Sequence, residues 1–446
     1  MPRRRAYAGS GASLISRRSF LGGVAAALGG LMLGGCGVTS LAAERLVVDF
    51  WNLFGGGDGA RLDEMERAFR ESRPEVRLNS TTLAWGAPYY TKLAMSAVGG
   101  RPPDVAILHQ SRLAAYAPAG LLEPLDPQLL SEFDMGPDSF LPEVLEASRY
   151  EGEIYAIPLD THPFVQYYNT DICKEAGLLG PDGELKPLEG PDAVIDALKR
   201  AKEVTGDLGL SFYPADDAGP WRLWYTLYGQ LDGEAILSPD AREVTLDEEK
   251  ALRAVEFMVA LAQDAEVVRA NIDYGGSVAQ FLSGRAGFHW NGEWEVTTYL
   301  EADLPFSMLP FPNVFGENHV SQADRHTFVI PTQSSRDPRS MEAALEFISS
   351  MLKSSLIWAK GGHIPAYLPV ANSDEYRELK PQSNYAGVAD NVVIDPIAWF
   401  SGSGSTMEQR ASAAFQSAMA GGISPRQAVV RLRTILQELV NIPKPI

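Results

Sequence analysis

Short apolar segments alternate with longer amphipathic ones along the first third of the chain. Residues 46–51 form a near-continuous apolar run, which is typical of a strand buried on both faces, and 76–82 and 104–108 are the next two predicted strands. Helical periodicity follows these strands at 60–71, 88–98 and 112–118. This alternation of strand and helix predicts a parallel sheet with helices on its faces, and hence an α/β fold.

The same two patterns continue to the end of the chain. Strands are predicted at 208–213, 286–290 and 328–331, and longer helices at 187–204, 248–265, 341–353 and 425–439. A chain of 446 residues is too long for one hydrophobic core, so two to three domains are expected.

Residues 150–169 predict a crossing between two sheets. Pro158 and Pro163 bracket a short segment that holds Asp160 and His162, and an aromatic, β-branched strand follows at 164–168. Proline stiffens an extended segment, so the two polar side chains would be presented at a hinge. An ordinary edge strand with a solvated Asp160 and His162 is the alternative. A second crossing is predicted at 305–312.

The N-terminus has the pattern of an export signal. Three arginines and a later Arg17-Arg18 pair precede an apolar run at 21–33, which is too short to span a bilayer and ends at Cys36. The Arg pair followed by Phe-Leu resembles a twin-arginine signal, and LGGC resembles a bacterial lipobox. We therefore expect lipid attachment at Cys36. A general secretion signal cleaved elsewhere is the alternative.

Charge narrows the choice of partners. Removal of residues 1–35 takes away five arginines and no acid, so the formal net charge of −19 becomes −24. A surface this acidic disfavours nucleic acid and disfavours anionic lipid as a partner of the folded part. With Cys36 consumed by lipid, Cys173 has no partner, so we expect no disulfide and a buried, apolar role for this thiol.

Aromatic and short polar residues gather at predicted strand ends. A sugar has apolar C–H faces and a rim of hydroxyls, so its site needs aromatic platforms beside groups that donate and accept hydrogen bonds. The candidate ligand-binding residues are Trp51, Asn52, Trp85, His109, Gln110, Asp160, His162, Asp217, Trp221, Asn291, Glu293, Trp294 and Trp399. Any one of these tryptophans is expected in a core more often than in a site, but their shared context favours a site.

Signals for catalysis and metal binding are weak. Glu293 and Glu295 lie two residues apart, whereas glycosidase carboxylates usually come from different strands. The six histidines show no ligand spacing, so no metal site is expected. The glycines at 55–59 lack the Lys-Ser/Thr of a phosphate loop, so no nucleotide is expected either.

Five stretches, in order, resemble the extracellular solute-binding proteins of bacterial ABC importers, in the sugar-binding group related to maltose-binding protein. They are VDFWNLFGGGDG, YYTKLAMSAVGGRPPDVAILHQSRLAAYAPAGLLEPLD, GEIYAIP with YYNTDICKEAGL, FLSGRAGFHWNGEW and GGHIPAYLPV. The resemblance covers most of residues 46–440. It implies a two-lobed periplasmic-binding-protein-like clamshell with discontinuous lobes, which closes by hinge bending and does no chemistry on its ligand.

The resemblance also implies an organisation and partners. The expected division is a twin-arginine-type lipoprotein signal peptide at 1–35, a lipid-anchored tether at 36–45, an N-terminal lobe at 46–158 plus 306–370, and a C-terminal lobe at 159–305 plus 371–446. The expected partners are a carbohydrate ligand and the permease subunits of an ABC importer. The protein is expected to be a monomer, anchored by lipid on the outer face of the cell membrane or in the periplasm, with no cofactor.

The resemblance also implies which positions of this chain contact the ligand. Trp51, Asn52, Trp85, His109 and Gln110 match strand-end contacts, and Asp160 and His162 match the hinge. Trp294 matches a stacking tryptophan, and Trp399 a C-terminal aromatic. Because His162 stands where the maltose-binding relative has an acid, its particular sugar is not carried over.

Two other functions remain open. One is an extracellular glycosidase. The other is the same fold with a polyol or glycerol-phosphate ligand, which is disfavoured because the expected site is acidic and Arg222 is its only nearby cation.

Overall fold

A five-stranded sheet contains the strands predicted in the first third of the chain. The computed structural model describes residues 46–233, 235–316 and 318–444, and its first sheet has the order β2-β1-β3-β12-β6. These strands are β2 (Arg77–Thr82), β1 (Val47–Asn52), β3 (Val105–His109), β12 (His326–Val329) and β6 (Ile157–Pro158). β1 is parallel to β2 and β3, as predicted, whereas β12 is antiparallel to β3 and β6. The carboxyl ends of β1, β2 and β3 therefore share one edge, where ligands bind in open α/β sheets.

Amphipathic helices bury their apolar faces against this sheet. The long ones are α1 (Gly56–Ser72), α2 (Ala87–Val98) and α12 (Pro338–Lys353). The ring of Phe50 on β1 lies 4.9 Å from that of Phe347 on α12, and Phe69 on α1 lies 5.2 Å from Phe347. Helix α12 begins where Pro338 follows Asp337, whose side chain accepts from the backbone N–H of Arg339. The predicted helix at 341–353 is thus confirmed, with an earlier start.

The second sheet has seven strands. Its order is β14-β11-β7-β9-β8, and β10 and β13 also pair with β7. The strands are β14 (Val392–Val393), β11 (Ser321–Asp324), β7 (Asp160–Asn169), β9 (Ala286–Gly292), β8 (Leu208–Ser211), β10 (Phe306–Pro310) and β13 (Ile364–Pro365). β8 is parallel to β9, and β7 is antiparallel to β9, β10, β11 and β13.

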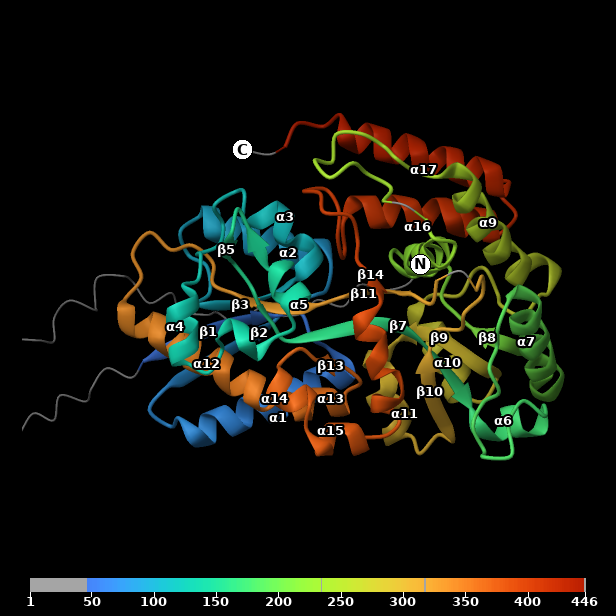
Figure 1. Cartoon of the computed structure of the whole chain (residues 1–446), viewed down its shortest axis with the longest axis horizontal. Coiled ribbons are helices and arrows are strands. Elements are labelled where there is room, and N and C mark those ends of the chain that lie inside the picture. The colour runs from blue at the N-terminus through green and yellow to red at the C-terminus, as the bar shows by residue number, and fades with distance from the viewer. Residues whose placement is uncertain (1–45, 234, 317, 445–446) are drawn as a thin grey trace, which may run out of the picture. The chain divides into compact units, whose positions relative to one another are not determined.

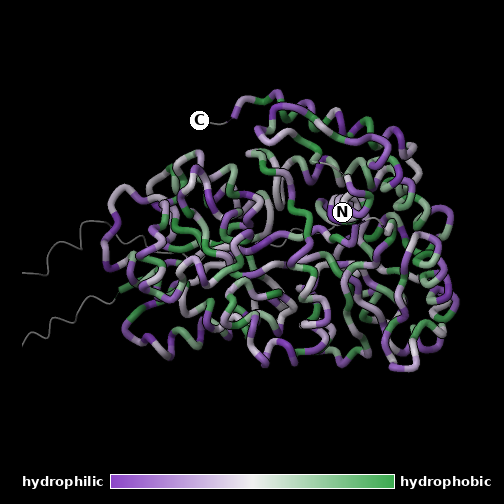
Figure 2. Tube along the Cα trace, viewed as in Figure 1, coloured by the Kyte–Doolittle hydropathy of each residue, from purple (hydrophilic) through white to green (hydrophobic). Residues whose placement is uncertain are grey.

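A second hydrophobic core forms between this sheet and its helices. The long helices are α7 (Pro191–Thr205), α8 (Gly219–Gln230), α9 (Glu248–Val259), α16 (Thr406–Met419) and α17 (Pro425–Val440). Trp221, Trp224 and Phe415 are buried in this core, with the rings of Trp224 and Phe415 5.0 Å apart. Helix α17, at the top of Figure 2, alternates between hydrophobic and hydrophilic residues, as expected of a helix with one buried face.

Short elements complete the described part. The short helices are α3 (Leu113–Tyr116), α4 (Pro127–Glu132), α5 (Pro142–Glu146), α6 (Thr170–Glu175), α10 (Tyr274–Leu282), α11 (Val296–Glu301), α13 (Ser355–Lys360), α14 (Leu368–Ala371) and α15 (Asp374–Glu378). β4 (Arg149–Tyr150) and β5 (Glu153–Ile154) form a separate hairpin. Cys173 on α6 is fully buried, as predicted.

The chain passes from the first sheet to the second at Leu159, between β6 and β7. Figure 1 shows β7 between the region of β1–β3 and the region of β8–β10. The predicted crossing is confirmed, but Asp160, His162 and Pro163 belong to one continuous ten-residue strand that is buried throughout, so the solvated-edge alternative is wrong. Pro163 lies where the partners of β7 change from β11 to β9, so its missing N–H interrupts no continuous ladder.

The return to the first sheet occurs at Arg325, between β11 and β12, and not at 305–312 as predicted. Residues 306–310 are strand β10, which pairs with β7, and Met308 is buried beside Tyr167 in a third apolar cluster. The alternation of apolar residues here belongs to a strand and not to a connection. The lobe boundaries stay a prediction, and the strand pairing places 306–310 and 321–324 in the second sheet.

In the described part of the chain, no helix is both long and apolar enough to cross a membrane. The predicted signal peptide, the tether and Cys36 lie outside the described residues.

Candidate functional site

A cavity of about 440 Å³ lies at the strand ends of both sheets. Its wall comes from the β1–α1 loop, the ends of β2, β3 and β12, strand β7, the β8–α8 region, and the starts of α10 and α11. The lining residues are Leu53, Phe54, Gly55, Gly56, Gly57, Asp58, Trp85, His109, His162, Tyr213, Asp216, Ala218, Arg222, Tyr274, Trp294, Glu295, Thr298 and His326. This size and the mixture of aromatic and polar groups suit a small organic ligand.

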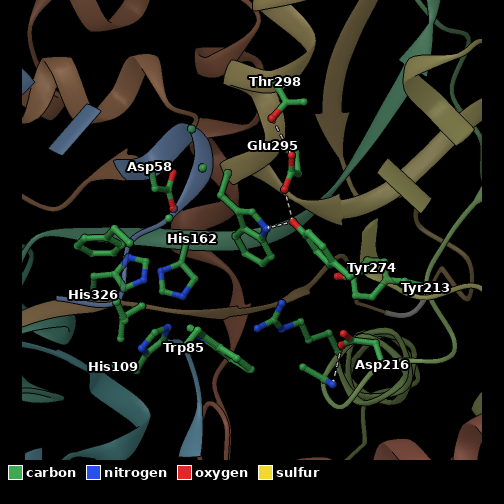
Figure 3. Close-up of a pocket in the computed structure, with 18 residues that line it drawn as sticks. Asp58, Trp85, His109, His162, Tyr213, Asp216, Tyr274, Glu295, Thr298 and His326 are labelled. Carbon is green, nitrogen blue, oxygen red and sulfur yellow. Dashed lines mark hydrogen bonds between the residues drawn. The ribbon is translucent and has the colours of Figure 1, made fainter. Parts of the chain in front are cut away.

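Trp294 is held in place by a short hydrogen-bond chain. Its indole Nε1 donates to the hydroxyl of Tyr274 over 2.7 Å. Tyr274 donates in turn to Glu295, whose other oxygen accepts from Thr298 Oγ1 at 2.9 Å (Figure 3). Gly292 lets the ring fold back, because a Cβ at this position would lie 1.8 Å from the Trp294 ring. The orientation of this aromatic surface is therefore fixed by its own lobe.

A cation lies between two tryptophans of the cavity. The guanidinium of Arg222 is 4.8 Å from the ring centre of Trp294 and 5.8 Å from that of Trp85. Trp294 follows β9 of the second sheet, whereas Trp85 follows β2 of the first. Aromatic faces from both lobes thus bracket one charged group.

Asp160 is the centre of a buried hydrogen-bond network behind the cavity wall. Its Oδ1 accepts from His162 Nδ1 at 3.0 Å and from the backbone N–H of His326 at 2.9 Å. Its Oδ2 accepts from His326 Nδ1 at 2.7 Å and from Trp358 Nε1 at 2.6 Å. Burial by itself raises the pKa of Asp160, but His326, His363 and His162 outweigh it and hold this pKa well below its ordinary value. Asp160 is thus an ionised, fully buried group that orients the imidazoles around it.

Two histidines at the wall, His109 and His162, are held in the neutral form. Burial and the neighbouring His326 lower the pKa of His162 to about 3, against the opposing effect of Asp160. Burial also lowers the pKa of His109, whose Nδ1 is 2.7 Å from the hydroxyl of Tyr90. In Figure 3, His109, His162 and His326 group on one side of the cavity, opposite Tyr213, Tyr274 and Asp216. The neutral imidazoles of His109 and His162 can donate or accept hydrogen bonds, as a hydroxyl-rich ligand requires.

His363 links carboxylates from both lobes. Its Nε2 is 3.0 Å from Asp58 Oδ1, and its Nδ1 is 3.1 Å from Asp160 Oδ2 and 3.0 Å from Glu293 Oε1. Burial alone lowers the pKa of His363, but Asp58 and Asp160 outweigh it and raise this pKa well above the ordinary value. Burial raises the pKa of Glu293 to about 7, partly opposed by His363. Glu293 is therefore a buried partner of His363 and does not line the cavity.

Four of these residues have the composition of a metal site. Asp160, His162, His326 and His363 bring donor atoms within 4.8 Å of one another, which the lack of ligand spacing in the sequence did not predict. However, both oxygens of Asp160 already accept two hydrogen bonds. The rings of His162 and His326 stack 4.0 Å apart at 25°, so the two ring planes that contain the nitrogen lone pairs are nearly parallel and the lone pairs do not converge on a nearby point. The contacts suit a hydrogen-bond network better than an ion.

Four predicted site residues line the cavity, namely Trp85, His109, His162 and Trp294. Asp160 lies behind His162, and Glu293 behind His363. Asn291 supports the site indirectly, because its Nδ2 donates to the Tyr274 hydroxyl at 3.3 Å.

The other predicted residues lie elsewhere, each for a local reason. Asn52 caps its own loop, where its Oδ1 accepts from the backbone N–H of Phe54 at 3.1 Å. Gln110 is buried and donates to Ser148 Oγ at 2.9 Å. Trp221 is expected at a strand end or loop but lies in α8, a helix that is buried almost all round, and its Nε1 donates to Asp395 at 2.9 Å.

Three more predicted residues are not part of the wall. Asp217 is exposed. Trp51 is half-buried under Lys92, whose Nζ is 5.1 Å from its ring, and Trp399 is half-buried against Phe400.

Several lining residues were missed. They are Asp58, Tyr213, Asp216, Arg222, Tyr274, Glu295, Thr298 and His326. A signal existed for Asp58, which follows the glycines after β1, and for Glu295, which is adjacent to Trp294. The sequence marks Arg222 only as a nearby cation, and His326 is the first residue of β12, a strand that the sequence placed two residues too late.

Two lobes built on separate sheets, with a cavity lined from both, define the clamshell fold of proteins that close around a solute. Residues 79–380, more than half of the chain, match the family model of bacterial extracellular solute-binding proteins. The chain belongs to this family, so the resemblance seen in the sequence is confirmed.

Individual relatives are distant. A maltotriose-binding protein of Pyrococcus abyssi is 24% identical over 50% of this chain and 44% of its own length. A maltodextrin-binding protein of Bacillus subtilis is 23% identical over 61% of this chain and 63% of its own. The alignments thus span less than two thirds of these relatives.

Solved structures support the same fold. The GacH receptor of Streptomyces glaucescens, determined without ligand and with acarbose, aligns with a TM-score of 0.75 at 19% identity. The alignment covers 88% of this chain and 98% of the receptor.

Proposed function

We propose that this protein is a receptor that binds a carbohydrate in the cavity between its lobes and delivers it to the permease of an ABC importer. The observation that carries the proposal is the pair Trp85 and Trp294, which come from different lobes and line one cavity. Two aromatic faces beside imidazoles, hydroxyls and carboxylates provide both the stacking and the hydrogen bonds that a sugar needs. The relatives named for maltotriose and maltodextrin support a sugar ligand.

Titration of the purified protein with a panel of mono- and oligosaccharides, followed by tryptophan fluorescence and calorimetry, tests the proposal. Saturable binding of at least one sugar is expected. The change in tryptophan fluorescence that comes from Trp294 should disappear in Trp294→Phe but not in Trp399→Phe. Polyols and glycerol phosphate belong in the same panel. Binding of one of these instead of any sugar would overturn the choice of ligand while keeping the receptor role.

Membrane attachment through a lipidated Cys36 is part of the proposal. It rests on the sequence around the cysteine. Full-length protein expressed in a bacterial host should partition into the detergent phase, and Cys36→Ser should move it to the aqueous phase. An unchanged partition would show that the anchor is not there.

We infer that the protein performs no chemistry on its ligand. Glu293, half of the carboxylate pair considered in the sequence, is fully buried beside His363, and Glu295 is occupied by Tyr274 and Thr298. Aryl glycosides incubated with the wild type should stay intact. Turnover that Glu293→Gln abolishes would establish the enzyme alternative instead.

A further inference from the structure

Arg222 presents its guanidinium to the cavity without a close ion-pair partner. Its side chain is 12% exposed and extends from the first turn of α8, between the rings of Trp85 and Trp294. Among the described residues, the only carboxylate oxygen within 4.0 Å of its nitrogens is Oε1 of Glu408, at 4.0 Å from Nε. That distance is beyond hydrogen-bonding range, so no carboxylate of the protein occupies the N–H fork. The hydroxyl of Tyr213 is a further polar neighbour of the guanidinium, and it carries no charge to balance it.

The acids nearest to Arg222 form no close ion pair with it. Glu408 is buried, and its Oε2 accepts from the backbone N–H of Gly404 at 2.5 Å. Burial raises the pKa of Glu408 to about 8, against the opposing effect of Arg222, so this carboxyl is mostly protonated at neutral pH. Asp216 Oδ1 accepts hydrogen bonds from the backbone N–H groups of Ala218 and Gly219, at 2.8 and 2.9 Å.

The remaining acids of the wall have partners of their own. Asp58 is paired with His363 at 3.0 Å. Glu295 accepts from Tyr274 and Thr298. Among the charged residues of the described protein that line the cavity, Arg222 therefore has no carboxylate at hydrogen-bonding distance, and the acidic sequence around the site does not by itself exclude an anion.

A planar guanidinium binds a carboxylate through two parallel N–H···O bonds, and an aromatic ring stacks on a sugar face. Here both groups occur together, because the guanidinium lies against the two indole faces. We propose that the ligand is an acidic sugar, a uronic acid or an oligosaccharide that contains one, and that Arg222 selects it by binding its carboxylate. The inference rests on the proposed function and names the substrate class of the same cavity.

Matched sugars test this selection. Binding of glucose and glucuronate, of galactose and galacturonate, and of the corresponding disaccharides is measured by calorimetry at fixed ionic strength. The acidic member of at least one pair should bind about tenfold more tightly or better, as a charge-assisted pair predicts. Only the affinity for the acidic sugar should fall as the sodium chloride concentration is raised, because salt screens the interaction of the charged ligand and not that of the neutral one.

Variants assign the preference to Arg222. Arg222→Gln should weaken binding of the acid about tenfold or more and leave the neutral sugar nearly unchanged, and Arg222→Lys should give an intermediate loss because it keeps the charge without the fork. Arg253→Gln is the control, since Arg253 also lies over an aromatic ring, Phe315, but outside the cavity. Thermal unfolding confirms that each variant is folded.

The outcomes separate the two proposals. Equal affinity for neutral and acidic members, or a preference that Arg222→Gln leaves intact, overturns the selection while the receptor role stands. If a sugar phosphate binds more tightly than every uronate, the proposal that Arg222 recognises a carboxylate is wrong. Failure of all sugars to bind overturns the proposed function itself.

Discussion

The indole of Trp294 and the hydroxyl of Tyr274 share a hydrogen bond of 2.7 Å, which fixes an aromatic face at the wall of the cavity. A stacking surface held in advance loses little entropy when a ligand binds, so it contributes more to affinity than a mobile ring would.

Trp294→Ala should weaken carbohydrate binding by about 1–3 kcal/mol, because the variant loses the stacking surface. Calorimetry with the best sugar of the panel measures the loss. Trp399→Ala is the control and should bind normally, since Trp399 does not line the cavity. Unchanged affinity in Trp294→Ala would show that Trp294 packs in the protein and does not contact the ligand.

Gly292→Ala should displace Trp294, because the added Cβ would lie 1.8–2.2 Å from three atoms of its ring. We expect weaker ligand binding and an altered tryptophan emission spectrum in a folded protein. Gly387→Ala is the matched control, since a Cβ there meets nothing within 4 Å. Equal affinity of the two variants would mean that the ring adapts without consequence.

Asp160→Asn should lower the free energy of unfolding by about 3–5 kcal/mol, the usual cost of removing one partner from a buried charged network. The amide would place an N–H₂ group among the N–H groups of His162, His326 and Trp358, which now donate to the carboxylate. Urea denaturation measures the change. Asp138→Asn, at an exposed position, should leave the midpoint nearly unaltered. A similar midpoint for both variants would contradict the role of Asp160 as the centre of the network.

Glu408 should make stability depend on pH. Burial raises its folded-state pKa to about 8 from an ordinary value of 4.5, so the folded state holds a proton that the unfolded state releases. Its contribution to stability is therefore full at acid pH and is lost as the pH rises from about 4.5 to about 8.

Glu408→Gln removes this titration. The stability of the variant relative to the wild type should increase steadily between about pH 5 and pH 8, measured by urea denaturation at several pH values. A difference that stays flat over this range would show that Glu408 is ionised throughout.

The residue pattern by itself determined much of this protein. The apolar runs at 46–51 and 104–108 became strands of the first sheet, and the periodic segments near 341–353 and 425–439 became helices, because secondary structure follows local periodicity. The crossing near Asp160 and the place of Trp294 at a strand end were also readable, since prolines, glycines and strand ends are local signals.

Only the tertiary structure decided which side chains meet. His162, His326 and His363 lie far apart in the sequence yet surround one carboxylate, and Arg222 reaches between tryptophans of both lobes. Trp221 and Glu293 look like site residues in the sequence but are buried. Such contacts depend on how two sheets pack and close, and a one-dimensional spacing does not specify that geometry.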